Sequence, residues 1–156
     1  MYEIKDVKEF IKFIIELLDE ECETESWYDS YGNMVNFFER GGCYDLAKVI
    51  KHYFPSCEYA VRNDNEHVAT LYKGKLYDAS DYFDGIENEK DLSDYKIYSE
   101  EEIDNFPIPF GRVPSIKGLK VPDFIIKTID DIPSVRVNPD YKKNSIKLWY
   151  YFSVYV

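Results

Sequence analysis

The sequence has few of the residues that hold small secreted or zinc-dependent domains together. It has three cysteines, Cys22, Cys43 and Cys57, which are too few and too scattered for a disulfide framework. No Cys-x-x-Cys pair occurs, so a structural zinc site is not expected. An EF-hand is not expected either, because the aspartates in residues 78–84 are not followed by the glycine and terminal glutamate of a calcium loop. We therefore expect reduced thiols, no metal and no cofactor.

Long apolar runs are also absent. No stretch approaches the ~20 apolar residues that a membrane span requires. The first 21 residues mix acidic and basic side chains through their apolar positions, whereas a signal peptide has a basic start and an unbroken apolar middle. The expectation is a cytoplasmic protein with no membrane association.

Positive charge is scarce. The chain has 19 Lys and Arg against 30 Asp and Glu, which gives a formal net charge of −11. Such a chain would repel the phosphates of nucleic acid, because that binding draws mainly on Lys and Arg. The negative charge either keeps the protein in solution or attracts a basic protein partner, and composition alone leaves both interpretations open.

Against these absences, the patterning predicts an α+β fold. The 156 residues fit one domain, residues 1–156, with N-terminal helices followed by an antiparallel sheet. Helices are predicted from apolar spacings of three and four and from caps, at residues 4–21, 43–53, 99–105 and 122–132. Residues 23–42 are predicted to form a short helix or an ordered loop that ends at Gly41-Gly42. Strands are predicted at residues 57–62, 67–72, 75–80, 134–138 and 145–156. Residues 81–98 look irregular, and the proline-rich residues 106–122 are predicted to form an ordered loop or a lid.

The stretch from Gly41 to Gly85 carries the chemistry. Gly41 and Gly42 can adopt a positive φ at the end of one helix, and Cys43 opens the next. His67 opens one strand, and Asp78 closes the strand that follows it. A hairpin centred on Lys73-Gly74 would place residue 67 opposite residue 80, and residue 69 opposite residue 78. His67 and Asp78 would then be diagonal neighbours on the same face of the sheet.

These three residues have the chemistry of a nucleophile, a base and an orienting acid. The first turn of a helix favours the thiolate of Cys43, His67 would take the thiol proton, and Asp78 would fix the imidazole. The backbone amide of Cys43 could donate to an oxyanion. Asn33, Asn36 or a residue of the loop 39–42 would supply a second donor.

The motif GGCYDLA followed by HVATLYKGKLYDAS resembles the papain-like cysteine superfamily in its compact bacterial and phage versions. These include cell-wall endopeptidases, transglutaminase-like cores and uncharacterised phage or plasmid proteins. The resemblance covers about 45 residues, and it implies that a cysteine-bearing helix packs on an antiparallel sheet that carries the histidine. By this resemblance Cys43 corresponds to the nucleophile, His67 to the base and Asp78 to the orienting acid. Tyr44 stands where related enzymes often carry a tryptophan.

Two functions are therefore predicted as alternatives. The first is a thiol-dependent amide hydrolase or acyl-transferase (peptidase, deamidase or transglutaminase-like) that acts on a peptide or protein substrate. The second is a non-catalytic acidic binding or inhibitor protein from a phage or mobile element, which would engage a basic protein partner. A structural component whose catalytic-looking residues are vestigial is a third possibility. An isolated cysteine is also commonly just a small buried hydrophobe.

Overall fold

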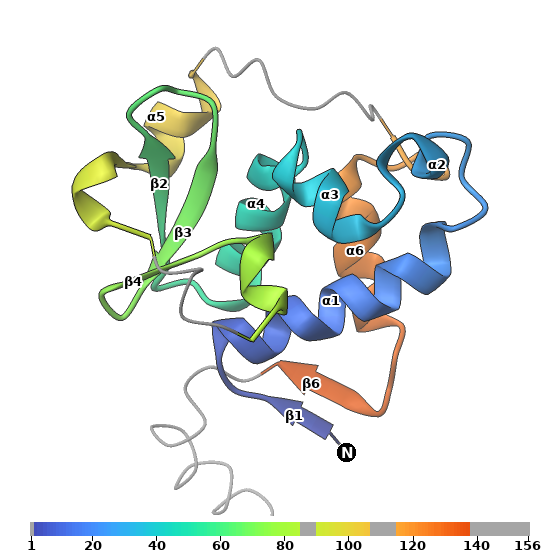
Figure 1. Ribbon diagram of the computed structural model, residues 1–156. Helices are drawn as coiled ribbons and strands as arrows, with labels where there is room; N and C mark the ends of the chain where they lie inside the picture. Colours follow the sequence, from blue (N-terminus) through green and yellow to red (C-terminus); the bar gives the residue numbers. More distant parts are fainter. Residues whose placement is uncertain (1, 85–89, 107–114, 138–156) are drawn as a thin grey trace, which may run out of the picture.

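Helices pack against a small antiparallel sheet in the computed structural model of the protein, which describes residues 2–84, 90–106 and 115–137 (Figure 1). The predicted α+β class is confirmed. The long first helix lies below the others in Figure 1, and the sheet lies to one side of the helices. No helix within the described residues is long and apolar enough to cross a membrane.

Helix α1 spans Val7–Cys22, close to the predicted range. It begins at Val7 because the side chain of Asp6 accepts a hydrogen bond from the Glu9 amide, which caps the first turn. Its buried face carries only apolar residues and a cysteine: Val7, Phe10, Ile11, Ile14, Ile15, Leu18 and Cys22. This face forms the centre of the main core.

The region after α1, predicted as a short helix or an ordered loop, contains two short helices, α2 (Tyr28–Tyr31) and α3 (Met34–Glu39). The chain then turns directly into α4 (Cys43–Tyr53), which ends before Pro55 as predicted. The turn corrects one expectation, because Gly42 has a φ of −92° and not a positive value. Glycine is needed there for space: a Cβ at Gly42 would lie 2.6 Å from Cε1 of Phe37.

Four strands form the antiparallel sheet in the order β4-β3-β2-β5. They are β2 (Glu58–Arg62), β3 (Val68–Tyr72), β4 (Lys75–Tyr77) and β5 (Tyr95–Tyr98). Residue 70 pairs with residue 77 and residue 72 with residue 75, which is the predicted hairpin register. Strand β5 was not predicted, because 81–98 were expected to be irregular. It pairs with β2 from Tyr59↔Tyr98 to Arg62↔Tyr95, so the strand depends on a partner distant in the sequence.

The remaining elements complete the molecule. Two short 3₁₀ turns, η1 (Ala79–Tyr82) and η3 (Leu92–Asp94), lie between β4 and β5. The predicted capping box of Ser99 and Glu102 starts α5 (Glu100–Asp104). Helix α6 (Val121–Asp130) carries Pro122 in its first turn and packs against α4.

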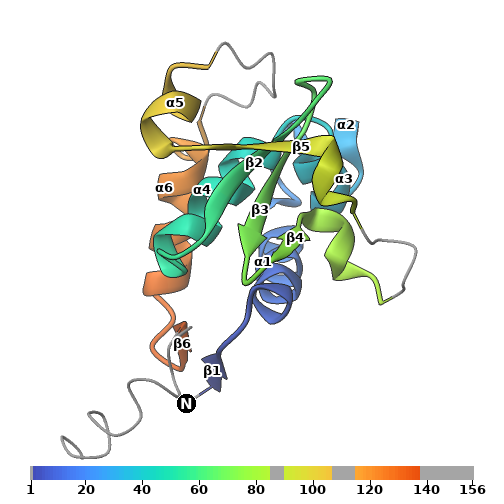
Figure 2. The same cartoon turned by 90° about the vertical axis from the view of Figure 1, so that its left-hand side faces the viewer.

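A second, parallel pair of strands joins β1 (Tyr2–Ile4) to β6 (Val135–Val137). Figure 2 shows this pair below α1, apart from the antiparallel sheet. Most of the predicted lid, residues 107–114, and the predicted strand 145–156 lie outside the described residues.

Candidate active site

Cys43 lies in the first turn of α4, where the amides of the first residues have no partner within the helix. Its side chain is 3% exposed and belongs to an apolar cluster with Tyr59, Val61 and Val68 of the sheet. The predicted packing of the cysteine-bearing helix on the antiparallel sheet is therefore present. The same cluster includes Ile103 of α5.

The β3–β4 hairpin brings His67 and Asp78 together. Lys73 and Gly74 have φ values of +49° and +79°, as a tight two-residue turn requires. The register of the hairpin then places residues 67 and 78 on one face as diagonal neighbours. His67 Nε2 lies 2.7 Å from Asp78 Oδ2, and the two residues are only 4% and 6% exposed.

The other side chain that acts on the His67 imidazole is Cys43. Its proximity raises the pKa of the imidazole. Because Nε2 is engaged by Asp78, we infer that Nδ1 is the nitrogen on the Cys43 side. The structure thus brings Cys43, His67 and Asp78 into one chain of contacts, in the order that thiol, base and acid require.

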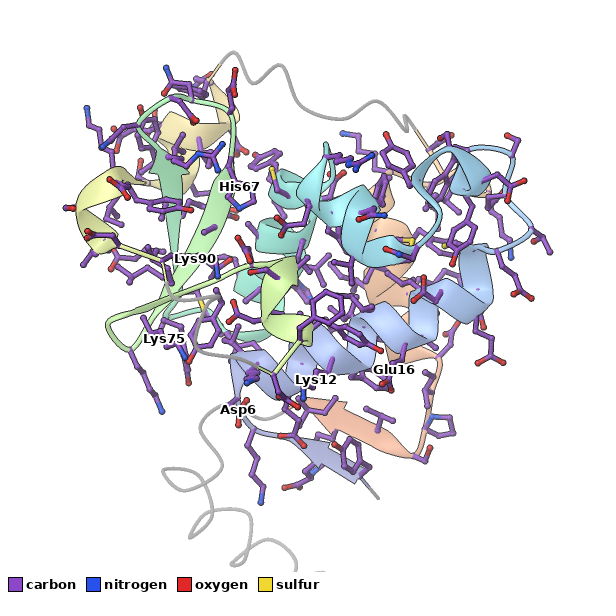
Figure 3. The ribbon with its side chains drawn as sticks, viewed as in Figure 1. Asp6, Lys12, Glu16, His67, Lys75 and Lys90 are labelled. Carbon is purple, nitrogen blue, oxygen red and sulfur yellow. The ribbon has the colours of Figure 1, made fainter. Side chains whose placement is uncertain are left out.

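Asp78 is held by more than the imidazole. Its Oδ1 accepts hydrogen bonds from the backbone amide and the hydroxyl of Ser80, and it caps η1. The Nζ of Lys90 lies 3.1 Å from Asp78 Oδ1 and 3.0 Å from Asp81 Oδ2. Figure 3 shows His67 and Lys90 between the sheet and the helices. The carboxylate of Asp78 is therefore fixed from several sides.

The electrostatics favour a charged His67. Burial lowers the pKa of the imidazole, but the hydrogen bond with Asp78 and the proximity of Cys43 outweigh it and raise the pKa to about 9. For Asp78, burial raises the pKa, yet the His67 hydrogen bond and the Lys90 charge lower it well below the ordinary value. At neutral pH the pair is therefore an imidazolium hydrogen-bonded to a carboxylate.

Glu39, the last residue of α3, is a third acidic group beside this pair. Its carboxylate lies within 4.8 Å of ligand atoms of both His67 and Asp78. Burial and the charge of Asp78 raise the pKa of Glu39, and His67, Lys90 and the Ser80 backbone oppose that shift. In the described part of the chain, Glu39 Oε1 is buried and has no hydrogen-bond partner.

Glu39, His67 and Asp78 together have the donor types of a metal site, which the sequence did not predict. Their present geometry does not fit one. Two ligands of a tetrahedral Zn²⁺ with bonds of about 2.0–2.1 Å stand roughly 3.3 Å apart, whereas His67 Nε2 and Asp78 Oδ2 are 2.7 Å apart. The ammonium of Lys90 also occupies the other Asp78 oxygen. The arrangement is that of a hydrogen-bonded pair, so we assign no metal role to these residues.

Asn33 and Asn36, the predicted oxyanion donors, have a structural role at the start of α3. The side chain of Asn33 accepts a hydrogen bond from the Asn36 amide and caps the helix. Asn36 Nδ2 donates to the carbonyl of Tyr31. Donation from either side chain to an oxyanion at Cys43 stays a prediction.

The other two cysteines differ from Cys43 in their surroundings. All three thiols are free and buried, as the prediction of reduced cysteines requires. Burial raises the pKa of both Cys22 and Cys57 to about 12. Neither thiol is among the main groups that change the pKa of His67. These two are ordinary core thiols.

Sequence reasoning missed Lys90, Asp81 and the proximity of Glu39 to the imidazole. Lys90 lies 12 residues beyond Asp78 in an acidic segment, where no periodic pattern places its side chain. Asp81 carries a signal that was available: it stands three residues after Asp78, the spacing of a capping box. Glu39 is four residues before Cys43, across a tight turn whose geometry the sequence did not give.

The fold and site define an α+β protein with a buried Cys-His-Asp constellation at the end of a helix. A family model described as "Phage YunG-like protein" matches residues 11–108, well over half of the chain. The chain therefore belongs to the phage YunG-like family, and the matched range contains Cys43, His67 and Asp78. Searches of curated proteins and of solved structures found no match.

Proposed function

We propose that this protein is a thiol-dependent amide hydrolase or acyl-transferase, similar in its site to papain-like cysteine enzymes. The observation that carries the proposal is the buried contact of 2.7 Å between His67 Nε2 and Asp78 Oδ2, with Cys43 close enough to raise the pKa of the same ring. A raised imidazole pKa of about 9 favours the thiolate–imidazolium pair that such enzymes use. The phage family name agrees with the compact phage versions of that superfamily.

The chemistry would proceed through a thioester. The Cys43 sulfur attacks the carbonyl carbon of the amide, and the carbonyl oxygen becomes an oxyanion near the Cys43 backbone amide. The imidazolium of His67 gives its proton to the leaving nitrogen, the C–N bond breaks and an amine departs. His67 then takes a proton from water, which attacks the thioester, releases a carboxylic acid and restores the thiolate. An amine in place of water gives acyl transfer.

Site-resolved labelling tests the nucleophile. We expect iodoacetamide at pH 6 to alkylate Cys43 in the folded protein, because an ordinary thiol with a pKa near 8.5 is only about 0.3% ionised there. Cys22 and Cys57 are matched internal controls, since burial raises the pKa of each to about 12. If total labelling of the folded protein is the same in Cys43→Ala, the activated thiol does not exist.

Acyl transfer is tested with p-nitrophenyl acetate. The expected result is a burst of p-nitrophenolate equal to the protein concentration, with the acetyl group on Cys43 by mass spectrometry. Cys43→Ala should give no burst. His67→Gln should give a slower one, because the base is lost while the thiol remains. Acetylation on lysine alone would count against a thioester intermediate.

A second candidate is a non-catalytic binding protein that captures a basic protein partner. Two observations favour it: the net charge of −11 and the 3% exposure of Cys43. Such capture would weaken steeply with added salt and would survive Cys43→Ala. Retention of a basic protein such as lysozyme that ignores ionic strength would argue against it.

A further inference from the structure

One carboxylate oxygen of Glu39 is buried beside the Cys-His-Asp constellation. Glu39 ends α3, and this helix packs against η1, the turn that Asp78 caps. The carboxylate reaches within 4.8 Å of ligand atoms of both His67 and Asp78. An unpaired, buried carboxylate oxygen is unfavourable unless a nearby positive charge compensates it. In the described residues Glu39 Oε1 has no hydrogen-bond partner, although a hydrogen bond from the Ser80 backbone also stabilises the ionised carboxylate.

The positive charges available to Glu39 are those of the site. Both the His67 imidazole and the Lys90 ammonium act to stabilise ionised Glu39, whereas Asp78 opposes it. Lys90 is already bound by Asp78 and Asp81 at 3.1 and 3.0 Å. Of the two, the imidazolium has the larger effect on Glu39. The ionisable groups that face this cluster come from α3, α4, η1, the segment before η3, and β5: Glu39, Cys43, Asp78, Asp81, Lys90 and Tyr95.

We propose that Glu39 is a second acidic positioning residue for His67, which acts beside Asp78 to keep the imidazole protonated. Asp78 fixes the ring through a hydrogen bond. Glu39 acts through its charge, because its interaction with His67 is electrostatic and not a hydrogen bond. The inference takes its meaning from the proposed function, but its test needs no substrate and no catalysis.

The chain offers a clean way to observe His67. It has two histidines, and the other, His52, lies in the exposed last turn of α4. In a His52→Gln background, every imidazole signal in a ¹⁵N NMR titration belongs to His67. We expect this parent to titrate near pH 9. We expect Glu39→Gln to lower the midpoint by about one pH unit, because a charge about 5 Å away is lost while the side chain keeps its shape.

Matched variants separate a charge effect from a structural one. Glu39→Asp keeps the charge and should retain most of the parent midpoint. Asp84→Asn removes an exposed carboxylate just after η1, which pairs with Lys8 and Lys12. This variant should leave the midpoint unchanged. Asp78→Asn should lower the midpoint more than Glu39→Gln does, because it removes the direct hydrogen bond as well as a charge.

Two results would overturn the inference. One is a Glu39→Gln midpoint within about 0.2 pH unit of the parent while Asp78→Asn is strongly shifted. The other is an equal shift in Glu39→Gln and Glu39→Asp, which would point to packing and not to charge. If instead the midpoints behave as expected but iodoacetamide does not label Cys43, Glu39 positions His67 in a protein whose thiol is not a nucleophile. The two proposals therefore fail separately.

Discussion

Two buried regions of this molecule have opposite chemistry. The main core, which includes the buried face of α1, is built from apolar side chains such as Phe10, Ile14 and Ile15, each 0% exposed. The site between α4 and the sheet buries charge: three of the four buried polar or charged residues among those described are His67, Asp78 and Asp81. Lys90 and part of Glu39 join them. Burying so many ionisable groups costs free energy that an apolar replacement would avoid.

The difference separates what specifies the fold from what specifies the chemistry. An apolar core tolerates exchanges of similar volume, since burial of any such surface is favourable. A buried set of charges works only when each member has its partner. Strongly perturbed ionisable groups that converge at one place are also typical of functional sites. Substitutions in the two regions should therefore change different measured quantities.

The largest effect is expected in the core. Phe10 packs against Tyr53 and Phe54, with ring centroids 5.2 and 5.5 Å apart. Phe10→Ala should lower the free energy of unfolding by about 3–5 kcal/mol, because it removes apolar contact and leaves a cavity. Urea unfolding followed by circular dichroism measures this change. Iodoacetamide labelling of Cys43 below the transition should stay close to wild type. A stable variant with slower labelling would show that the two regions are not separable.

The next effect is a pH dependence of stability that belongs to the site. The pKa of His67 rises from 6.5 to about 9 on folding. A raised pKa adds stability that is fully present below pH 6.5 and lost as the pH rises through 9. The shift corresponds to at most about 3 kcal/mol. Urea unfolding at pH 6 and pH 9.5 should show this loss in the wild type relative to His67→Gln. The comparison cancels the ionisation of Cys22 and Cys57, so parallel curves would contradict the prediction.

Asp78→Asn should reduce the reactivity of the thiol more than the stability of the core. Without the carboxylate, the imidazolium loses its partner at 2.7 Å. The imidazole is then no longer fixed beside the thiol, and the alkylation rate of Cys43 should fall by about an order of magnitude. Asp84→Asn is the matched control, because that carboxylate is exposed and pairs with Lys8 and Lys12. Equal losses in both variants would point to a general change in charge.

The smallest effect is expected at Gly42, where the two regions meet. A Cβ at this position would lie 2.6 Å from the Phe37 ring, which belongs to the main core. Gly42→Ala should cost on the order of 1–2 kcal/mol of unfolding free energy and also slow Cys43 labelling, since the first turn of α4 has to shift. The double variant with Phe37→Leu should recover part of both losses. No recovery would mean that the contact with the ring is not the cause.

The sequence predicted those parts of the fold that depend on local patterns. The spacing of apolar residues gave α1, and Lys73-Gly74 gave the hairpin register that places His67 beside Asp78. The capping box at Ser99 gave α5. In each case the energetic cause lies within a few residues, so it is visible without a structure.

What the sequence did not predict depends on contacts between distant segments. Strand β5 exists because it pairs with β2, and Tyr95–Tyr98 alone shows too short a pattern. Lys90 reaches Asp78 only once the chain between β4 and β5 is folded. From the sequence, Gly42 was expected to provide a positive φ, but glycine is needed there because a Cβ would clash with the ring of Phe37. Three-dimensional packing, and not residue type, sets each of these features.

The parallel pairing of β1 with β6 has a practical consequence for dissecting the protein. The family match covers residues 11–108 and so includes every member of the site, but it leaves out β1, β6 and α6. A fragment cut to that range would uncover the side chains against which α6 buries Phe124 and Ile125. Such a fragment would carry all the reactive groups and still be prone to aggregate. Truncation experiments on relatives of this chain should therefore keep both β1 and β6.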